Sequence, residues 1–244
     1  NLEEVRRTIL GRPEQVQSQL NTSYATILNL YEKYKDDLFK VYPLSLHYFQ
    51  SHKHTQKEAI KLMEAKLKLL EELGYIENGA LSAKGKFAKN VYGYELLLSE
   101  LYAENFLEQL DEFGLGVMAA AAVFEPRKNQ RMLSLSKASR KIRAFSEETY
   151  GRIKNKEFRY RIHPFSKLPY FHLSGSMEAW LRGTDFTKIL QFTDTDEGEV
   201  VRYFRMSVQI LREILAAPIS SILKDRIKET IRVLNRDIVD AEKQ

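Results

Sequence analysis

Three arginines and a glutamine recur at intervals of three and four residues near the end of the chain. They are Arg202, Arg205, Gln209 and Arg212, and Met206 and Glu213 border them. At 3.6 residues per turn, a helix would place all four on one face. A row of guanidinium groups with no acid on its axis suits contact with the phosphates of a nucleic acid. A solvated surface face is the other interpretation.

The helix that carries this row is predicted from its own pattern. Residues 196–217 repeat apolar side chains with helical spacing, and these would form a core-facing side opposite the arginines. We expect Asp196 and Glu199 to cap the start of the helix, where acids complement its positive end. With neither residue in the core, we also expect Arg202→Ala and Arg205→Ala to leave folding intact.

A second positive region lies in the middle of the chain. Residues 126–161 contain twelve Lys and Arg against three acids, whereas the whole chain has a net charge of +5. Clustering of this kind is a possible electrostatic footprint for phosphates. A basic surface connection would give the same pattern.

Other short motifs suggest chemistry but fit it poorly. In 79–86 the spacing of the glycines is wrong for a phosphate loop, and Phe87 stands where a Ser or Thr should bind magnesium. The DEFG stretch at 111–114 reads as a turn between helices, and Ser176 as a helix cap. His47, His52 and His54 are close in sequence but lack a further ligand for a metal.

Bulk composition excludes several classes. With no cysteine among 244 residues, the chain has no disulfide, thiolate metal site or cysteine nucleophile. Because no apolar stretch approaches 18 residues, we expect no membrane span, and the first residues do not resemble a signal peptide. We expect a cytoplasmic protein with no catalytic residue, cofactor or metal in this chain.

The periodicity predicts a mainly α fold. Helices are expected at 21–35 with Asn21 or Thr22 as cap, near Pro43, at 56–73, across 91–125 and 134–155, and at 175–182, 185–191, 196–217 and 219–241, with an ordered loop at 158–174. Asn78-Gly79 lies between two short β-capable pieces and predicts a hairpin. Three helices followed by a hairpin outline a winged helix. We therefore expect a linker at 1–20, a winged-helix domain at 21–90 and a multi-helix bundle at 91–244.

Three stretches resemble one helicase family. Residues 81–126 contain Leu81, Lys84, Gly85, Lys86 and Ala88, then Glu95–Leu101 and Val123–Glu125; the others are 177–205 and 234–241. Together they are similar to the C-terminal region of the superkiller-like and exosome-associated superfamily-two helicases. The large arch insertion of the exosome-associated members is absent here.

The resemblance implies a function and a set of site residues. The chain would be the C-terminal, non-motor part of an ATP-dependent helicase, with two RecA-like motor domains upstream that bind ATP and magnesium. The 196–217 helix would be the ratchet helix, contacting single-stranded RNA, or DNA, through Arg202, Arg205, Met206 and Gln209, with Arg212 on the same stripe. Lys84 and Lys86 are further nucleic-acid candidates, because winged helices can bind a duplex.

Two other functions fit the sequence. One is a free-standing regulator that binds nucleic acid through its winged helix, and motor motifs upstream in the parent gene would eliminate it. The other is a helical interaction module with no nucleic-acid role, which an absence of binding at low salt would favour.

Overall fold

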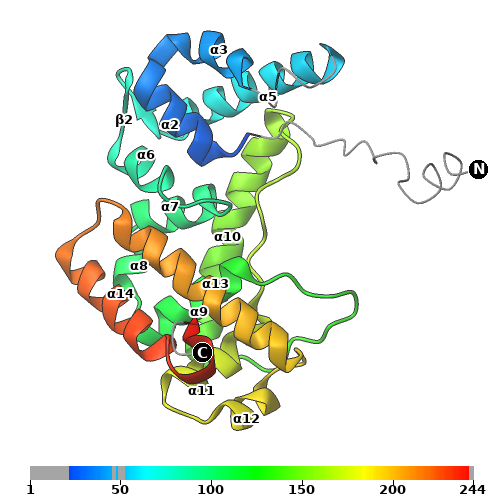
Figure 1. The fold of residues 1–244 in the computed structure, drawn as a ribbon, viewed down its shortest axis with the longest axis vertical. Helices are drawn as coiled ribbons and strands as arrows, with labels where there is room; N and C mark the ends of the chain where they lie inside the picture. The colour runs from blue at the N-terminus through cyan, green and yellow to red at the C-terminus, as the bar shows by residue number, and fades with distance from the viewer. Residues whose placement is uncertain (1–21, 46–47, 49–52, 242–244) are drawn as a thin grey trace, which may run out of the picture.

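The computed structural model describes residues 22–45, 48 and 53–241. The predicted linker at 1–20, together with His47 and His52 of the histidine group, lies outside the described residues. The fold is mainly α, with a small hairpin and a helical bundle, as predicted (Figure 1). In the described part of the chain, no helix is long and apolar enough to span a membrane.

Three helices form the first part of the structure. They are α2 (Tyr24–Tyr34), α3 (Leu38–Val41) and α5 (Lys53–Glu72), with 3-10 turns η1 (Lys35–Asp37) and η2 (Tyr42–Leu44) between them. The cap of α2 is Ser23 and not Asn21 or Thr22, because the Ser23 hydroxyl accepts a hydrogen bond from the Thr26 backbone N–H at 3.1 Å. Pro43 lies in the first turn of η2, where its missing N–H costs nothing.

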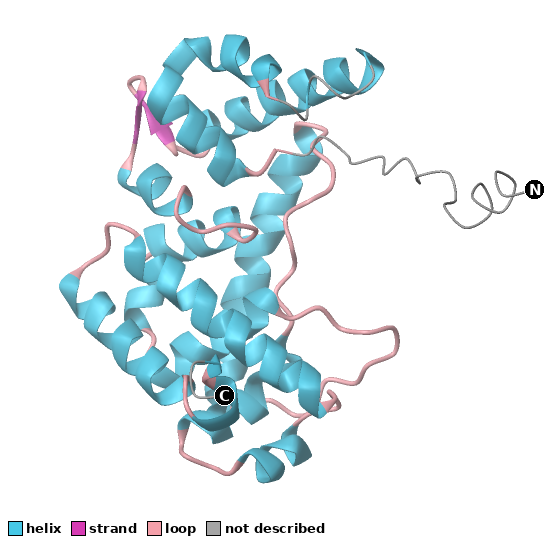
Figure 2. Ribbon diagram, in the orientation of Figure 1, coloured by secondary structure: helices cyan, strands magenta, loops and turns pink. Residues whose placement is uncertain are grey.

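The hairpin forms where the sequence predicts it. Strands β1 (Ile76–Glu77) and β2 (Ala80–Leu81) pair antiparallel, with Ile76 opposite Leu81 (Figure 2). Asn78 and Gly79 have φ values of 50° and 72°, the positive values that this tight turn requires. Ser82 then caps α6 (Ala83–Ala88) by accepting from the Gly85 N–H at 3.2 Å.

The remaining helices form the bundle. They are α7 (Glu95–Ala103), α8 (Phe106–Gln109), α9 (Glu112–Val123), α10 (Lys137–Arg159), α11 (Ser174–Leu181), α12 (Phe186–Ile189), α13 (Glu197–Ala216) and α14 (Ser221–Leu234), with 3-10 turns η3 (Phe171–Leu173), η4 (Leu190–Phe192) and η5 (Asp237–Val239). The last helix ends at Leu234, earlier than predicted. Beyond it, Arg236 stacks on the Trp180 ring at 3.5 Å and donates to the Trp180 and Thr184 carbonyls, which turns the chain back onto α11.

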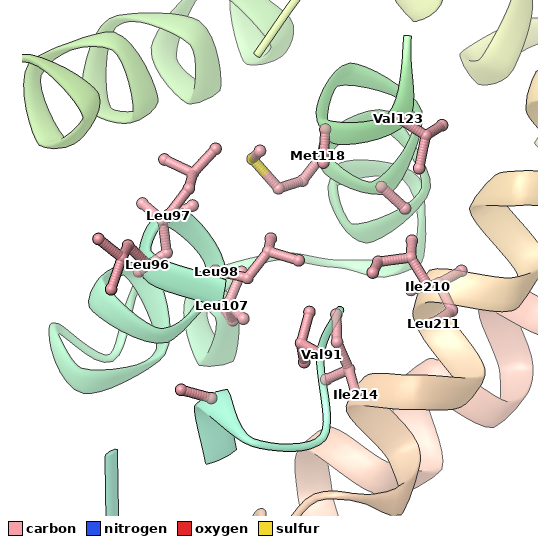
Figure 3. Close-up of a cluster of buried hydrophobic side chains, with 14 of the residues drawn as sticks. Val91, Leu96, Leu97, Leu98, Leu107, Met118, Val123, Ile210, Leu211 and Ile214 are labelled. Carbon is pink, nitrogen blue, oxygen red and sulfur yellow. The ribbon is translucent and has the colours of Figure 1, made fainter. Parts of the chain in front are cut away.

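Small residues let the central helix α9 pack closely. Ala119–Ala122 are all buried, and α9 contacts α11, α13 and α14. Between α7, α9 and α13, the core joins Leu97 and Met118 to Ile210 (Figure 3). Ser176 is not a helix cap but lies inside α11, where its buried hydroxyl donates to the Ile189 carbonyl at 3.0 Å.

Helix α10 joins the first three helices to the bundle, running from one to the other along the molecule (Figure 1). Near its end, Glu157 accepts a hydrogen bond from the Tyr24 hydroxyl at 2.8 Å, and Lys156 pairs with Glu72. The buried apolar side chains accordingly form one cluster that extends from Tyr24 to Val239. The predicted domain boundary between residues 90 and 91 stays a prediction.

Candidate nucleic-acid interface

Helix α13 has two chemically different faces. Val200, Phe204, Val208 and Leu211 are buried in the bundle core, as the periodicity predicts. Arg202, Gln209 and Arg212 are exposed on the opposite side. Burial of one face fixes the helix in the bundle, so the side chains of the other face start from a rigid backbone.

The acids at the start of α13 bind a basic residue from another segment. Asp196 is the N-cap residue, but its side chain makes no capping hydrogen bond. Instead, Arg127 pairs with Asp196 at 2.5 Å and with Glu199 at 3.1 Å. The predicted position of both acids at the start of α13 is therefore confirmed, but their carboxylates bind Arg127 and make no capping hydrogen bond.

Five of the twelve basic side chains in the segment 126–161 form ion pairs with described residues. Besides Arg127, Arg131 lies 3.9 Å from Asp194 and Arg143 pairs with Glu147 at 2.7 Å. Arg152 pairs with Glu104 and Lys156 with Glu72. Exposed cations near the start of α10, Lys137, Arg140 and Lys141, keep their charge without an ion pair among the described residues. The segment is thus less positive toward solvent than its composition indicates.

Arg202 and Arg212 present positive charge from α13. The Arg202 guanidinium lies 4.7 Å from the centre of the Tyr203 ring and donates to the Tyr203 hydroxyl at 3.3 Å. Arg212 makes no ion pair or hydrogen bond with the part of the chain that the structure describes, and it borders a shallow hollow beside Val239. Asp240 lines the same hollow, but neither guanidinium forms an ion pair within the described residues, so both can meet an external anion.

Arg205 has a structural contact that the sequence does not predict. Its guanidinium donates to the Val239 carbonyl at 3.1 Å and to the Ile238 carbonyl at 2.8 Å, and the side chain is half-buried. These bonds attach η5, after the last helix, to α13. The sequence-based expectation was that loss of the Arg205 side chain would leave folding intact. Because of these two bonds, we now expect its loss to reduce stability.

We expect Arg205→Ala to lower the free energy of unfolding by about 1.5 kcal/mol, because two carbonyls lose a charged donor. Arg202→Ala is the matched control and should change stability little, since its bonds lie on the surface. Chemical denaturation of both variants measures the difference. Equal stability of the two variants would contradict the structural role of Arg205.

Gln209 is linked to a loop far away in sequence. One oxygen of Glu213 accepts from the Gln209 amide at 3.2 Å, and the other accepts from the Tyr92 backbone N–H at 3.1 Å. Met206, between Arg202 and Gln209 on the same side, is half-buried against the core. The exposed face of α13 therefore continues onto the loop between α6 and α7.

Comparison with known proteins identifies the chain. Residues 78–242 match the family model described as the DSHCT (NUC185) domain, which covers more than half of the sequence. The chain belongs to the DSHCT domain family.

Two relatives of this DSHCT domain are named as helicases. It is 25% identical to the "ATP-dependent RNA helicase mtr4" of Schizosaccharomyces pombe over 193 residues, which are 72% of this chain and 17% of that protein. It is 26% identical to the "Antiviral helicase SKI2" of Saccharomyces cerevisiae over 194 residues, 73% of this chain and 15% of that protein. The chain thus spans less than a fifth of the length of both relatives.

The two candidate lysines near the start of the DSHCT domain differ in availability. Lys84 pairs with Glu100 at 2.9 Å, with both side chains largely buried, and lies 4.5 Å from the centre of the Tyr75 ring. It connects α6 to α7 and has no free charge to offer. Lys86 is exposed and remains available for a ligand. Of the two candidate lysines, Lys86 is therefore available for a ligand and Lys84 is not, and neither lies on α13.

The other motifs have local structural roles. Residues 79–86 form the hairpin turn, strand β2 and the start of α6, and Asp111 caps α9 by accepting from the Gly114 N–H at 2.7 Å. No group of three His, Cys, Asp or Glu side chains suited to a metal occurs in the described ranges.

Sequence reasoning missed Tyr92 and the bridging role of Glu213. The sequence predicted a helix from residue 91, whereas α7 begins only at Glu95 and Tyr92 lies in the loop before it. An aromatic residue beside Gly93 was the only signal, and it does not reveal its neighbour on α13. The contact depends on the packing of α7 against the bundle, and this is not local in sequence.

Proposed function

We propose that this chain is the C-terminal, non-motor part of an ATP-dependent RNA helicase and that α13 contacts the translocating single strand. Membership of the DSHCT domain family and the helicase relatives support the first part. RNA is the preferred substrate class because the mtr4 relative is named as an RNA helicase. The RecA-like motor domains, with ATP and Mg²⁺, would belong to the rest of the parent protein.

The observation that carries the second part is the state of Arg202 and Arg212. Both are exposed on a helix whose opposite face is buried, and neither has an ion pair among the described residues. Two guanidinium groups presented this way bind phosphates without reading the sequence. Contact that ignores sequence is what a motor needs as it moves along a strand.

The proposal divides the face of α13 by role. Arg202 and Arg212 would bind the sugar-phosphate backbone, while Arg205 holds η5 in place. Met206 and Gln209 would lie against the strand between the two arginines. The winged-helix part, including Lys86, would mainly dock the bundle onto the motor domains of the same chain.

We expect Arg202→Ala/Arg212→Ala to weaken binding of a ten-nucleotide single-stranded RNA about tenfold at low salt. Because a single strand gives a slope of about −0.7 per phosphate contacted, the plot of log affinity against log salt should flatten by about 1.4. Fluorescence anisotropy of labelled RNA, and of DNA of the same sequence, over a salt series measures both quantities. Arg205 stays unchanged in this variant, so that a loss of binding does not report a loss of folding.

Lys137→Ala/Lys141→Ala is the matched control. It removes the same charge from exposed positions on α10, and we expect it to leave the affinity close to that of the wild type. A larger loss in this control than in the α13 variant would move the site to the 126–161 segment. The chain alone should hydrolyse no ATP in the same buffer.

A further inference from the structure

Tyr92 exposes an aromatic ring beside the α13 face. It lies in the loop between α6 and α7, and 52% of its surface is exposed, an unusual fraction for a large aromatic side chain. Gly93, with φ of +84°, follows it and allows the chain to turn back toward α7. Because glycine adopts a positive φ without strain, the chain can turn at Gly93 while the Tyr92 ring stays exposed.

One hydrogen bond holds the Tyr92 backbone, and a second reaches the hydroxyl of its ring. The Tyr92 N–H donates to Glu213 at 3.1 Å, and its hydroxyl accepts from the Asn29 side-chain amide at 3.2 Å. The same nitrogen has two nearer acceptors, the Ala25 carbonyl at 2.9 Å and the Lys89 carbonyl at 3.1 Å, which hold Asn29 in place and share its two hydrogens with the Tyr92 hydroxyl. A ring that is anchored but half exposed loses little conformational entropy when a flat ligand stacks on it.

The surroundings of the ring favour a base over a phosphate. The Glu213 carboxylate lies between Tyr92 and Gln209 and contacts both, and its negative charge repels phosphate oxygens. Of the positive groups on this side of α13, Arg202 lies about three helical turns before Glu213, and Arg212 directly precedes Glu213 in the sequence. Phosphates would therefore be held by the arginines, and the space beside Glu213 would suit an uncharged ring.

We infer that Tyr92 stacks on a nucleobase of the same single strand whose phosphates contact Arg202 and Arg212. This inference rests on the proposed function and adds to it a base-stacking position on the α6–α7 loop. An aromatic ring accepts any of the four bases, so a position of this kind holds the strand without imposing a sequence. Tyr92 is then a binding residue, and the single strand contacts the α6–α7 loop as well as α13.

The test uses Tyr92→Ala, Tyr92→Phe and, as a control, Phe158→Ala, which removes another exposed aromatic ring from α10. The probe is a ten-nucleotide RNA, with 2-aminopurine at one position at a time, titrated in the anisotropy assay. We expect Tyr92→Ala to weaken binding about fivefold or more with an unchanged salt slope, since a ring and no charge is lost. At one probe position it should also relieve the quenching of 2-aminopurine that stacking produces. Tyr92→Phe should keep the affinity within twofold, and Phe158→Ala should match the wild type.

Wild-type affinity in Tyr92→Ala would overturn the inference, and so would equal losses in Tyr92→Ala and Tyr92→Phe, because the ring would then not be the binding group. The backbone bond to Glu213 survives in both variants, and thermal unfolding checks that both are folded. If Arg202→Ala/Arg212→Ala weakens binding and Tyr92→Ala does not, only this inference fails. If neither variant changes binding, the proposed function fails as well.

Discussion

Gly85→Ala is expected to lower the free energy of unfolding by about 3 kcal/mol, at the upper end of the usual cost of overpacking a core. Gly85 is buried in α6, and a Cβ at this position would overlap the backbone carbonyl oxygen of Tyr75. That carbonyl cannot move aside easily, because it accepts a hydrogen bond from the Ser82 N–H at 3.0 Å. The glycine between Lys84 and Lys86 is thus required for packing α6 against the hairpin.

Gly151→Ala is the control with the opposite sign. Gly151 lies inside α10, and a Cβ there would meet nothing within 4 Å. Alanine should therefore raise the free energy of unfolding by about 0.5–1 kcal/mol through its higher helix propensity. Urea denaturation of both variants gives the two values. Near-wild-type stability of Gly85→Ala would show that the hairpin can shift away from α6.

Glu157→Ala should lower the free energy of unfolding by about 3 kcal/mol, because it leaves several buried donors without an acceptor. Glu157 is fully buried on α10 and accepts from the Tyr24 hydroxyl at 2.8 Å and from the backbone and hydroxyl of Ser166, also at 2.8 Å. It therefore ties α2, α10 and the loop after α10 together. Loss of this carboxylate should separate the first helices from the bundle before the bundle itself unfolds.

The pKa values of two side chains beside Glu157, Lys66 and Tyr24, depend on its negative charge. Burial lowers the pKa of Lys66 to about 8, while the negative charges of Glu95 and Glu157 oppose this shift. Burial and the nearby Glu157 raise the pKa of Tyr24 well above its ordinary value. Removing Glu157 should therefore lower the pKa of Lys66 further, because one of the charges that stabilise its protonated form is gone.

Hydrogen exchange and equilibrium denaturation measure the effect of Glu157→Ala. The matched control is Glu148→Ala on the same helix, where the carboxylate is exposed and pairs with Arg152 at 3.3 Å, so we expect little change. Equal stability of the two variants would mean that water satisfies the donors around Tyr24. If Glu157→Ala loses hydrogen-exchange protection only in α2 and at the end of α10, Glu157 stabilises the contact between these two helices and not the whole bundle.

Much of the local structure follows from the sequence alone. Apolar spacing placed α13 and its buried face, and Asn78-Gly79 placed the hairpin. Residues 81–126, 177–205 and 234–241 resembled one C-terminal region, and residues 78–242 match the DSHCT domain family. These features depend on residues a few positions apart, so the order of residue types is enough to determine them.

Only the tertiary structure decided which charges remain for a ligand. Arg202 and Arg205 are equivalent in the sequence pattern, yet Arg205 is bound to the Val239 carbonyl and Arg202 faces outward. Arg127 meets Asp196, and Lys84 meets Glu100, across segments that the sequence does not place together. Tyr92 reaches the Glu213 carboxylate in the same way. The reason is physical: a helix pattern fixes which face a side chain is on, but its partner is fixed by how distant segments pack around one shared core.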